Sequence, residues 1–214
     1  MLPAHYAITE ILIVIATYFS VKKLFYYKNY YAAIGILLIG FTAFIGAIRF
    51  GVISNDFMVY LNRVLAVFAG IITMSLISIQ IVNNSLSKKI AHLLLAISII
   101  TLLLLFVWTQ PIFKLATLFI WSFAAILLTF QIPQESISSK FLKSFSMAIL
   151  LIAFLTLSKG IGLFTDLFPP SISFHIYHIL IALWVFLISY SISQKISISD
   201  NRVLAQTKKP YLNR

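Results

Sequence analysis

Long apolar runs, bounded by charged residues, proline or short Asn/Ser clusters, constrain this chain more than any other feature of its sequence. A helix needs about 20 apolar residues to cross roughly 30 Å of hydrocarbon. Seven such spans with short loops use almost all of the 214 residues and leave no room for a soluble domain. We therefore expect an all-α, polytopic membrane protein with a seven-helix transmembrane domain over 1–194 and a basic tail over 195–214. The expected helices are at about 5–21, 31–51, 57–82, 90–109, 112–131, 142–165 and 172–194.

The composition supports a membrane protein and narrows its partners. Only 10% of the residues are charged, whereas an ordinary soluble domain carries about 25%. The formal net charge is nevertheless +11, and in so apolar a chain we expect that excess to meet anionic membrane lipids rather than nucleic acid. There is no cysteine, which excludes disulfides and thiolate metal sites.

The basic residues fall mainly on one side of the expected bundle. Four of the 16 lie at the ends of helices on the opposite side, namely Arg49, Arg63, Lys114 and Lys159. The other twelve lie in the loops after the first, third and fifth helices and in the tail. The positive-inside rule then places the N-terminus outside and the C-terminus in the cytoplasm, in the inner membrane of the cell. The tail is expected either to lie on the anionic inner leaflet or to be solvated.

Polar residues inside the spans are informative, because each costs several kcal/mol in hydrocarbon unless it is paired or faces water. Counted at about 1.5 Å per residue, they gather in the outer half of the bundle, and we expect none in the inner half. The set comprises Glu10, Arg49, Asp56, Arg63, Lys159, Asp166, His175 and His178. We predict an outward-facing polar pocket in which Glu10 pairs with Arg49, Arg63 or Lys159. The alternative is that the cations snorkel to the headgroups and the two aspartates cap helices.

Two histidines three residues apart share one face of the last helix and can both point into the bundle. Imidazole is a common metal ligand, but His175 and His178 are only half of a zinc site. His5 lies on the correct side of the membrane to be a third ligand. The alternative is that the pair bonds to Glu10, to Asp166 or to backbone carbonyls.

Three segments resemble a known superfamily: Ala7–Leu12, Ile45–Gly51 and Phe174–Leu180. They are similar to the bacterial seven-helix proteins of unknown function related to the CREST superfamily, which includes alkaline ceramidases and the progestin and adipoQ receptors. The resemblance implies a seven-helix bundle that holds zinc. The ligands would be a histidine at the end of the second helix and histidines early in the seventh, beside an acid. The implied activity is hydrolysis of amide bonds in lipids.

Carried over residue by residue, this resemblance is incomplete. His178 and His175 match the histidines of the seventh helix with two intervening residues instead of three, and Glu10 matches the acid of the first helix. The histidine of the second helix has no counterpart, because Arg49 and Phe50 occupy its place. Either His5 or Glu10 replaces that ligand, or an Arg/Glu/His pocket for an anionic head group has replaced the metal. The expected roles are catalytic for Glu10, Asp56 and His178; head-group binding for Arg49, Arg63, Lys159 and Asp166; and zinc binding for His175 and His178, with His5 as a further candidate.

A transporter is the competing prediction. Seven spans in a chain of this length also suit two three-helix repeats joined by one helix, as in the sugar-transporting SWEET and PQ-loop proteins. Pro133-Gln134 resembles half of the PQ-loop signature, but the end of the first helix has neither residue. Transporters also place polar residues near the membrane midplane, whereas here they lie toward one face.

Overall fold

Seven helices account for nearly all of the residues that the structure describes. The structure is a computed structural model and describes residues 4–53, 55–107, 110–130, 137–155 and 170–208. Within those ranges the regular elements are all helical. In chain order they are α1 (Tyr6–Tyr26), α2 (Tyr30–Gly51), α3 (Asp56–Ser85), α4 (Lys88–Val107), α5 (Pro111–Phe130), α6 (Ile137–Leu155) and α7 (Pro170–Lys208).

Five helices are long and apolar enough to cross a membrane: α2, α3, α4, α5 and the Ser171–Ser193 part of α7. α1 has 21 residues but includes the charged Glu10, Lys22 and Lys23. The described apolar part of α6 is shorter, Phe141–Phe154. The predicted fold class, an all-α polytopic membrane bundle, is confirmed.

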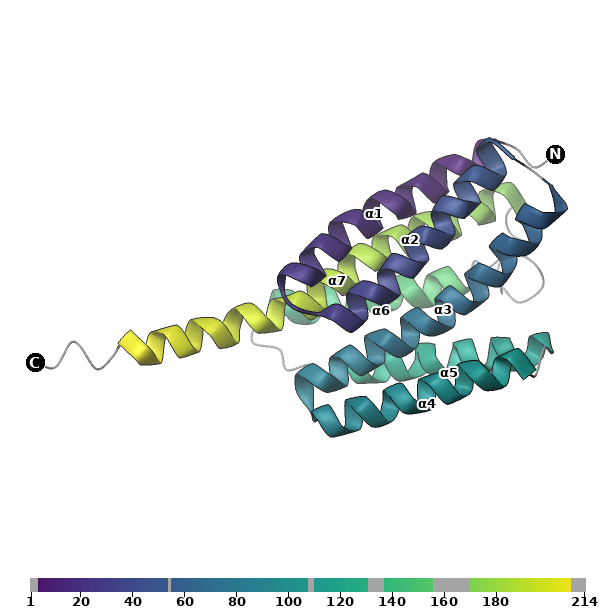
Figure 1. Ribbon diagram of the computed structural model, residues 1–214. Helices are drawn as coiled ribbons and strands as arrows, with labels where there is room; N and C mark the ends of the chain where they lie inside the picture. Colours follow the sequence, from purple (N-terminus) through teal and green to yellow (C-terminus); the bar gives the residue numbers. More distant parts are fainter. Residues whose placement is uncertain (1–3, 54, 108–109, 131–136, 156–169, 209–214) are drawn as a thin grey trace, which may run out of the picture.

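Three helices extend beyond their predicted ends. α1 continues to Tyr26, so the Lys22/Lys23 pair lies inside the helix, and α6 begins at Ile137, five residues early. α7 continues to Lys208, because the sequence has neither glycine nor proline between Ser171 and Pro210 to stop it. In Figure 1 its last part projects away from the other helices.

α1 lies between α2 and α7, and α2 also packs on α3 (Figure 1). α3 in turn contacts α4 and α5, while α6 packs on α7. α4 is peripheral, and only three of its residues are buried. The many exposed leucine, isoleucine and phenylalanine side chains on α4 and α5 are those expected of helix faces turned toward lipid.

The helices α1 and α7 run parallel and stay in register along their shared length. Three contacts join residues 165–167 positions apart. Thr9 contacts His175 near the N-terminal ends of the two helices. Further along, Ser20 donates to the carbonyl of Val185, and the Lys23 ammonium lies 3.0 Å from the centre of the Tyr190 ring. This constant offset fixes which residues of the two helices lie at the same level.

Glycines on α2 allow α1 to approach closely. A side chain at Gly40 would collide with Thr17, and one at Gly46 would collide with the carboxylate of Glu10. Such small residues are the usual means by which membrane helices pack tightly. They bring α2 directly against the polar side chains of α1.

The end of the bundle away from Glu10 is not free of polar groups, so that expectation was wrong. The turn between α1 and α2 is tied to α3 by side-chain amides: Asn84 donates to Asn29 at 2.8 Å, and Gln80 donates to Asn84 at 2.9 Å. Gln80 also accepts from the backbone N–H of Tyr31. Lys143, predicted as a loop cation at the edge of its helix, is buried within α6 because that helix starts earlier than expected.

Candidate functional site

A cavity of about 310 Å³ opens between six of the helices, and only α4 does not contribute to it. Small and large apolar side chains line most of its wall, among them Ile13, Ile39, Met74, Leu118 and Ile181. Polar side chains come from the first parts of α1, α3 and α7 and from the last part of α2. They are Glu10, Arg49, Asn62, Arg63, Tyr177 and His178. The cavity therefore has a polar end and an apolar body, which is the usual composition of a small-molecule site.

Glu10 and His178 form an ion pair across the α1–α7 contact. The Oε1 atom of Glu10 lies 3.3 Å from Nε2 of His178, and the two side chains are 7% and 13% exposed. Nδ1 of His178 lies 2.7 Å from the carbonyl oxygen of Phe174, one turn earlier on α7. A carbonyl only accepts, so Nδ1 carries a proton and donates it.

This arrangement makes the Glu10–His178 pair electrically neutral as a unit. In the ion pair, the negative charge of the Glu10 carboxylate and the positive charge of the His178 imidazolium cancel. The charge of the cavity therefore comes from the other ionisable groups in its wall, Arg49 and Arg63.

Arg49 is buried beside the cavity, with 8% of its surface exposed. Its Nη1 donates to Oδ1 of Asn62 at 3.1 Å, and the amide of Asn62 donates to the carbonyl of Thr42 at 3.3 Å. This chain of bonds holds the guanidinium in place, yet within the described part of the chain its Nε has no hydrogen-bond partner. Arg63, one residue after Asn62, is more exposed but also lines the cavity.

We expected Glu10 to pair with Arg49, Arg63 or Lys159. Among the described residues Glu10 forms an ion pair with His178 and not with Arg49 or Arg63, and Lys159 lies outside those residues. The alternative prediction, a bond from a histidine to Glu10 or to a backbone carbonyl, is confirmed for His178. The reason is the parallel register of α1 and α7, which brings the two side chains to one level.

His175 also turns toward α1, as the three-residue spacing predicts. Its Nδ1 lies 3.2 Å from the hydroxyl of Thr9, which in turn donates to the carbonyl of Tyr6. The ring of His5 lies 5.0 Å from that of His175. His5 and His175 therefore meet at the outer rim, while His178 lies one level deeper.

Aromatic rings close the polar end of the site. Phe174 stacks on Tyr6 with ring centres 4.2 Å apart and on His178 at 3.9 Å. Phe50, the residue after Arg49, contacts both Tyr6 and Phe174 edge-on at 5.3 Å. These ring contacts hold the imidazole of His178 in one orientation.

The described residues do not fit the zinc centre that the resemblance implies. No group of three or more histidine, aspartate or glutamate side chains is placed to hold a metal ion in the described ranges. Both nitrogens of His178 already have partners, and His175 is turned to Thr9. Arg49, a fixed cation, lies in the wall where a divalent ion would have to bind.

Other predicted site residues lie elsewhere. Asp56 is exposed in the first turn of α3, where the preceding Asn55 caps the helix by accepting from the N–H of Met58, and it does not line the cavity. A carboxylate at that place favours the helix through its dipole. Lys159, Asp166 and the Pro133-Gln134 pair lie outside the described residues.

Four residues of the site were missed by the sequence analysis: Asn62, Phe174, Tyr177 and Trp184. The position of Asn62 could have indicated the site. A side-chain amide inside a membrane span is unfavourable unless it is hydrogen-bonded, and Asn62 lies next to the charged Arg63. The spacing of Phe174 and His178, four residues apart, also predicts ring contact on a helix. Tyr177 and Trp184 give no such signal, because aromatic residues are common in membrane helices.

Comparison with known proteins adds no relative: no family model, curated protein or solved structure matches this chain. The candidate function therefore depends on the geometry of the cavity itself.

Proposed function

We propose that this protein binds an anionic amphiphile in the cavity, with the acidic group at Arg49 and the apolar part against the aliphatic wall. The observation that carries the proposal is Arg49 itself. It is buried, oriented by Asn62, and without an ion pair to any described acid. A buried cation with an unused donor is unfavourable until an anion joins it.

The charge balance of the wall supports an anion rather than a cation. Because Glu10 and His178 neutralise each other, Arg49 and Arg63 leave the polar end with a net positive charge. Arginine also presents a planar set of donors that suits carboxylate and phosphate groups. A neutral or cationic ligand would leave both guanidinium groups without compensation.

The apolar wall supports a ligand with a hydrocarbon part. Below the polar end the cavity is lined by residues such as Ile39, Ala43, Met74 and Ile181. Its volume of about 310 Å³ is at the small end of the range for ligand sites. The cavity thus suits a small amphiphile, or the head group and first carbons of a larger lipid.

In this proposal the protein is a binding relative of the CREST superfamily rather than a zinc hydrolase. The replacement of the second-helix histidine by Arg49 supports binding, because a fixed cation attracts an anion and repels a metal. The distribution of basic residues supports an orientation with the N-terminus outside the inner membrane. The polar end of the cavity would then lie on the outer side.

The test is a binding measurement on the full chain. The protein would be placed in phosphatidylcholine nanodiscs and titrated with decanoate, decanol and inorganic phosphate by calorimetry, with empty nanodiscs subtracted. Decanoate should bind, and decanol and phosphate should each bind at least about 10-fold more weakly, because each lacks one of the two groups that the cavity accommodates. Tight binding of phosphate alone would point to a soluble anion as the ligand.

A matched pair of variants assigns the site. Arg49→Gln should weaken decanoate binding about 10- to 100-fold, the loss expected for a hydrogen bond to a charged group. Lys88→Gln removes one exposed cation from the start of α4, far from the cavity, and should have no effect. Equal binding by wild type and Arg49→Gln would refute the proposal.

A further inference from the structure

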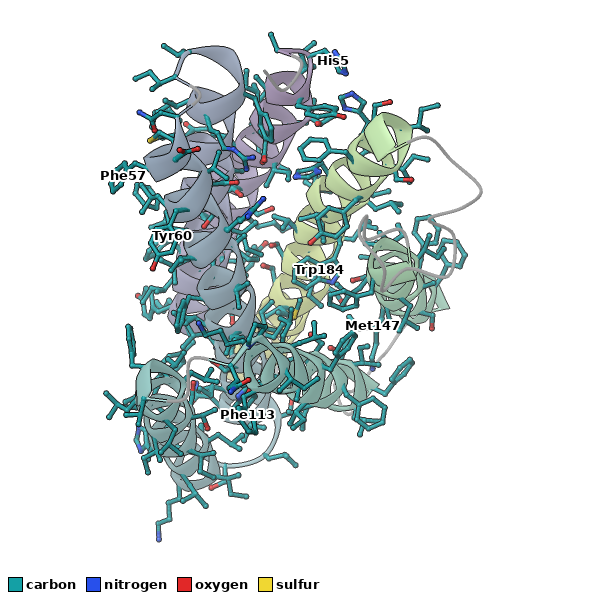
Figure 2. The ribbon with its side chains drawn as sticks, turned by 90° about the vertical axis from the view of Figure 1, so that its right-hand side faces the viewer. His5, Phe57, Tyr60, Phe113, Met147 and Trp184 are labelled. Carbon is teal, nitrogen blue, oxygen red and sulfur yellow. The ribbon has the colours of Figure 1, made fainter. Side chains whose placement is uncertain are left out.

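Trp184 of α7 is the polar group of the cavity that the proposed function leaves unexplained. It lies in the middle of the bundle (Figure 2), is 1% exposed and lines the cavity. Its indole nitrogen Nε1 has no hydrogen-bond partner among the residues that the structure describes. A buried N–H without an acceptor is costly, and buried tryptophans usually find one.

Trp184 lies well below the acidic end of the site. It follows His178 by six residues of a continuous helix, which at 1.5 Å per residue is about 9 Å along the axis. The neighbouring part of the wall is aliphatic, with Ile181 three residues earlier on α7 and Met74 on α3. The unpaired N–H is therefore an isolated polar point in an apolar surrounding.

We propose that the Trp184 N–H binds a neutral carbonyl oxygen in the hydrocarbon part of the ligand, about 9 Å below the level of His178 along the axis of α7. This rests on the proposed function and names the ligand class more closely, as an acidic chain that carries a ketone, ester or amide carbonyl. Indole is a donor only, so its partner must be an acceptor. A carbonyl oxygen is such an acceptor, and it brings no proton of its own into the apolar part of the wall.

The experiment compares isomers that differ only in where the carbonyl lies. An extended chain advances about 1.2 Å per bond, so the depth of about 9 Å between the levels of His178 and Trp184 corresponds to seven or eight bonds. The probes are 8-oxodecanoate, 4-oxodecanoate and decanoate, titrated into wild-type protein in the same nanodiscs. We expect 8-oxodecanoate to bind about 5- to 10-fold more tightly than 4-oxodecanoate, the effect of one buried hydrogen bond.

Two variants test whether Trp184 is the donor. Trp184→Phe keeps an aromatic ring but removes the N–H, and it should abolish the difference between the two isomers. Thr17→Val is the matched control, because Thr17 is also buried and has an unpaired hydroxyl, but it does not line the cavity. The control should retain the wild-type preference for the 8-oxo isomer.

The outcomes separate this proposal from the one on which it rests. If wild type binds the two isomers equally while Arg49→Gln still weakens both, the carbonyl subsite is wrong and the anion site stands. If Arg49→Gln has no effect on any probe, the proposed function fails. A preference that survives in Trp184→Phe would overturn the assignment to Trp184, and the wild-type comparison remains decisive if that variant does not fold.

Discussion

Oε1 of Glu10 lies 3.3 Å from Nε2 of His178, and this contact joins the first and the last helix through two residues that are 168 positions apart in the chain. Nδ1 of His178 donates to the carbonyl of Phe174, which leaves Nε2 to pair with Glu10. The pair thus stabilises the α1–α7 contact without an ion pair to Arg49 or Arg63. Its stability and the binding of an anion can therefore be tested separately.

Glu10→Ala should lower the free energy of unfolding by about 1–3 kcal/mol, because it leaves Nε2 of His178 buried without a partner. Glu10→Gln should retain most of that stability, since its amide can donate to Nε2 of a neutral imidazole. Asp56→Ala is the control and should cost less than about 1 kcal/mol, as expected for an exposed acid at a helix start. Unfolding in a denaturing-detergent titration measures all three. A Glu10→Ala protein as stable as wild type would contradict the pairing.

Gly46→Ala should destabilise the protein by displacing Glu10 from its contact with His178. A side chain at Gly46 would collide with the carboxylate of Glu10, and overpacking of this kind costs about 1–3 kcal/mol. Gly51→Ala is a matched control, because an added Cβ there would meet only that of Ala7 at 3.4 Å, an ordinary contact.

The collision predicts strong coupling between positions 46 and 10. In the double variant Gly46→Ala/Glu10→Ala the added methyl occupies space that the carboxylate has left, so the combined loss of stability should be smaller than the two single losses added together. Strict additivity in a double-mutant cycle would show that the two residues do not touch.

The sequence predicted the spans well, because apolar length is a direct requirement of the bilayer. It also placed Glu10 and His178 at similar depth, since depth follows from counting residues along a helix. It offered both a cation and a histidine as the partner of Glu10 without deciding between them, because the choice depends on how α1 and α7 align, and that register leaves no trace in either segment alone. The burial of Lys143 was missed for a related reason, because the start of α6 lies in a polar stretch that apolar periodicity does not mark.

The resemblance to zinc-dependent membrane hydrolases makes a prediction that the geometry does not favour. If that relationship includes the metal, the purified protein should hold one zinc per chain and lose it in His175→Ala and His178→Ala. Because His178 is bound to Glu10 and to Phe174, we expect far less than one zinc per chain in wild type and no change in either variant. Elemental analysis by mass spectrometry measures the zinc content of all three proteins. One zinc per chain in the wild type, lost on either substitution, would support the prediction of a zinc-dependent hydrolase.

The amide network at the other end of the bundle should contribute to stability independently of the cavity. Asn84→Ala removes the group that links Asn29 to Gln80 and leaves both short of a partner, so we expect a loss of about 1–3 kcal/mol. Asn83→Ala, one residue earlier on α3, is the control and should have little effect. Decanoate affinity should stay at the wild-type value in both variants. A loss of binding in Asn84→Ala would mean that the two ends of the bundle are coupled.

The absence of cysteine allows the orientation to be tested with single introduced thiols. Ile53 lies exposed in the turn between α2 and α3, and Lys88 lies exposed at the start of α4. The two positions are at opposite ends of α3, so they should be on opposite sides of the membrane. If the excess of basic residues sets the topology, a membrane-impermeant maleimide should label Ile53→Cys in intact cells and Lys88→Cys only after permeabilisation. The reverse pattern would place the polar end of the cavity on the cytoplasmic side, and an anion would then reach Arg49 from the cytoplasm.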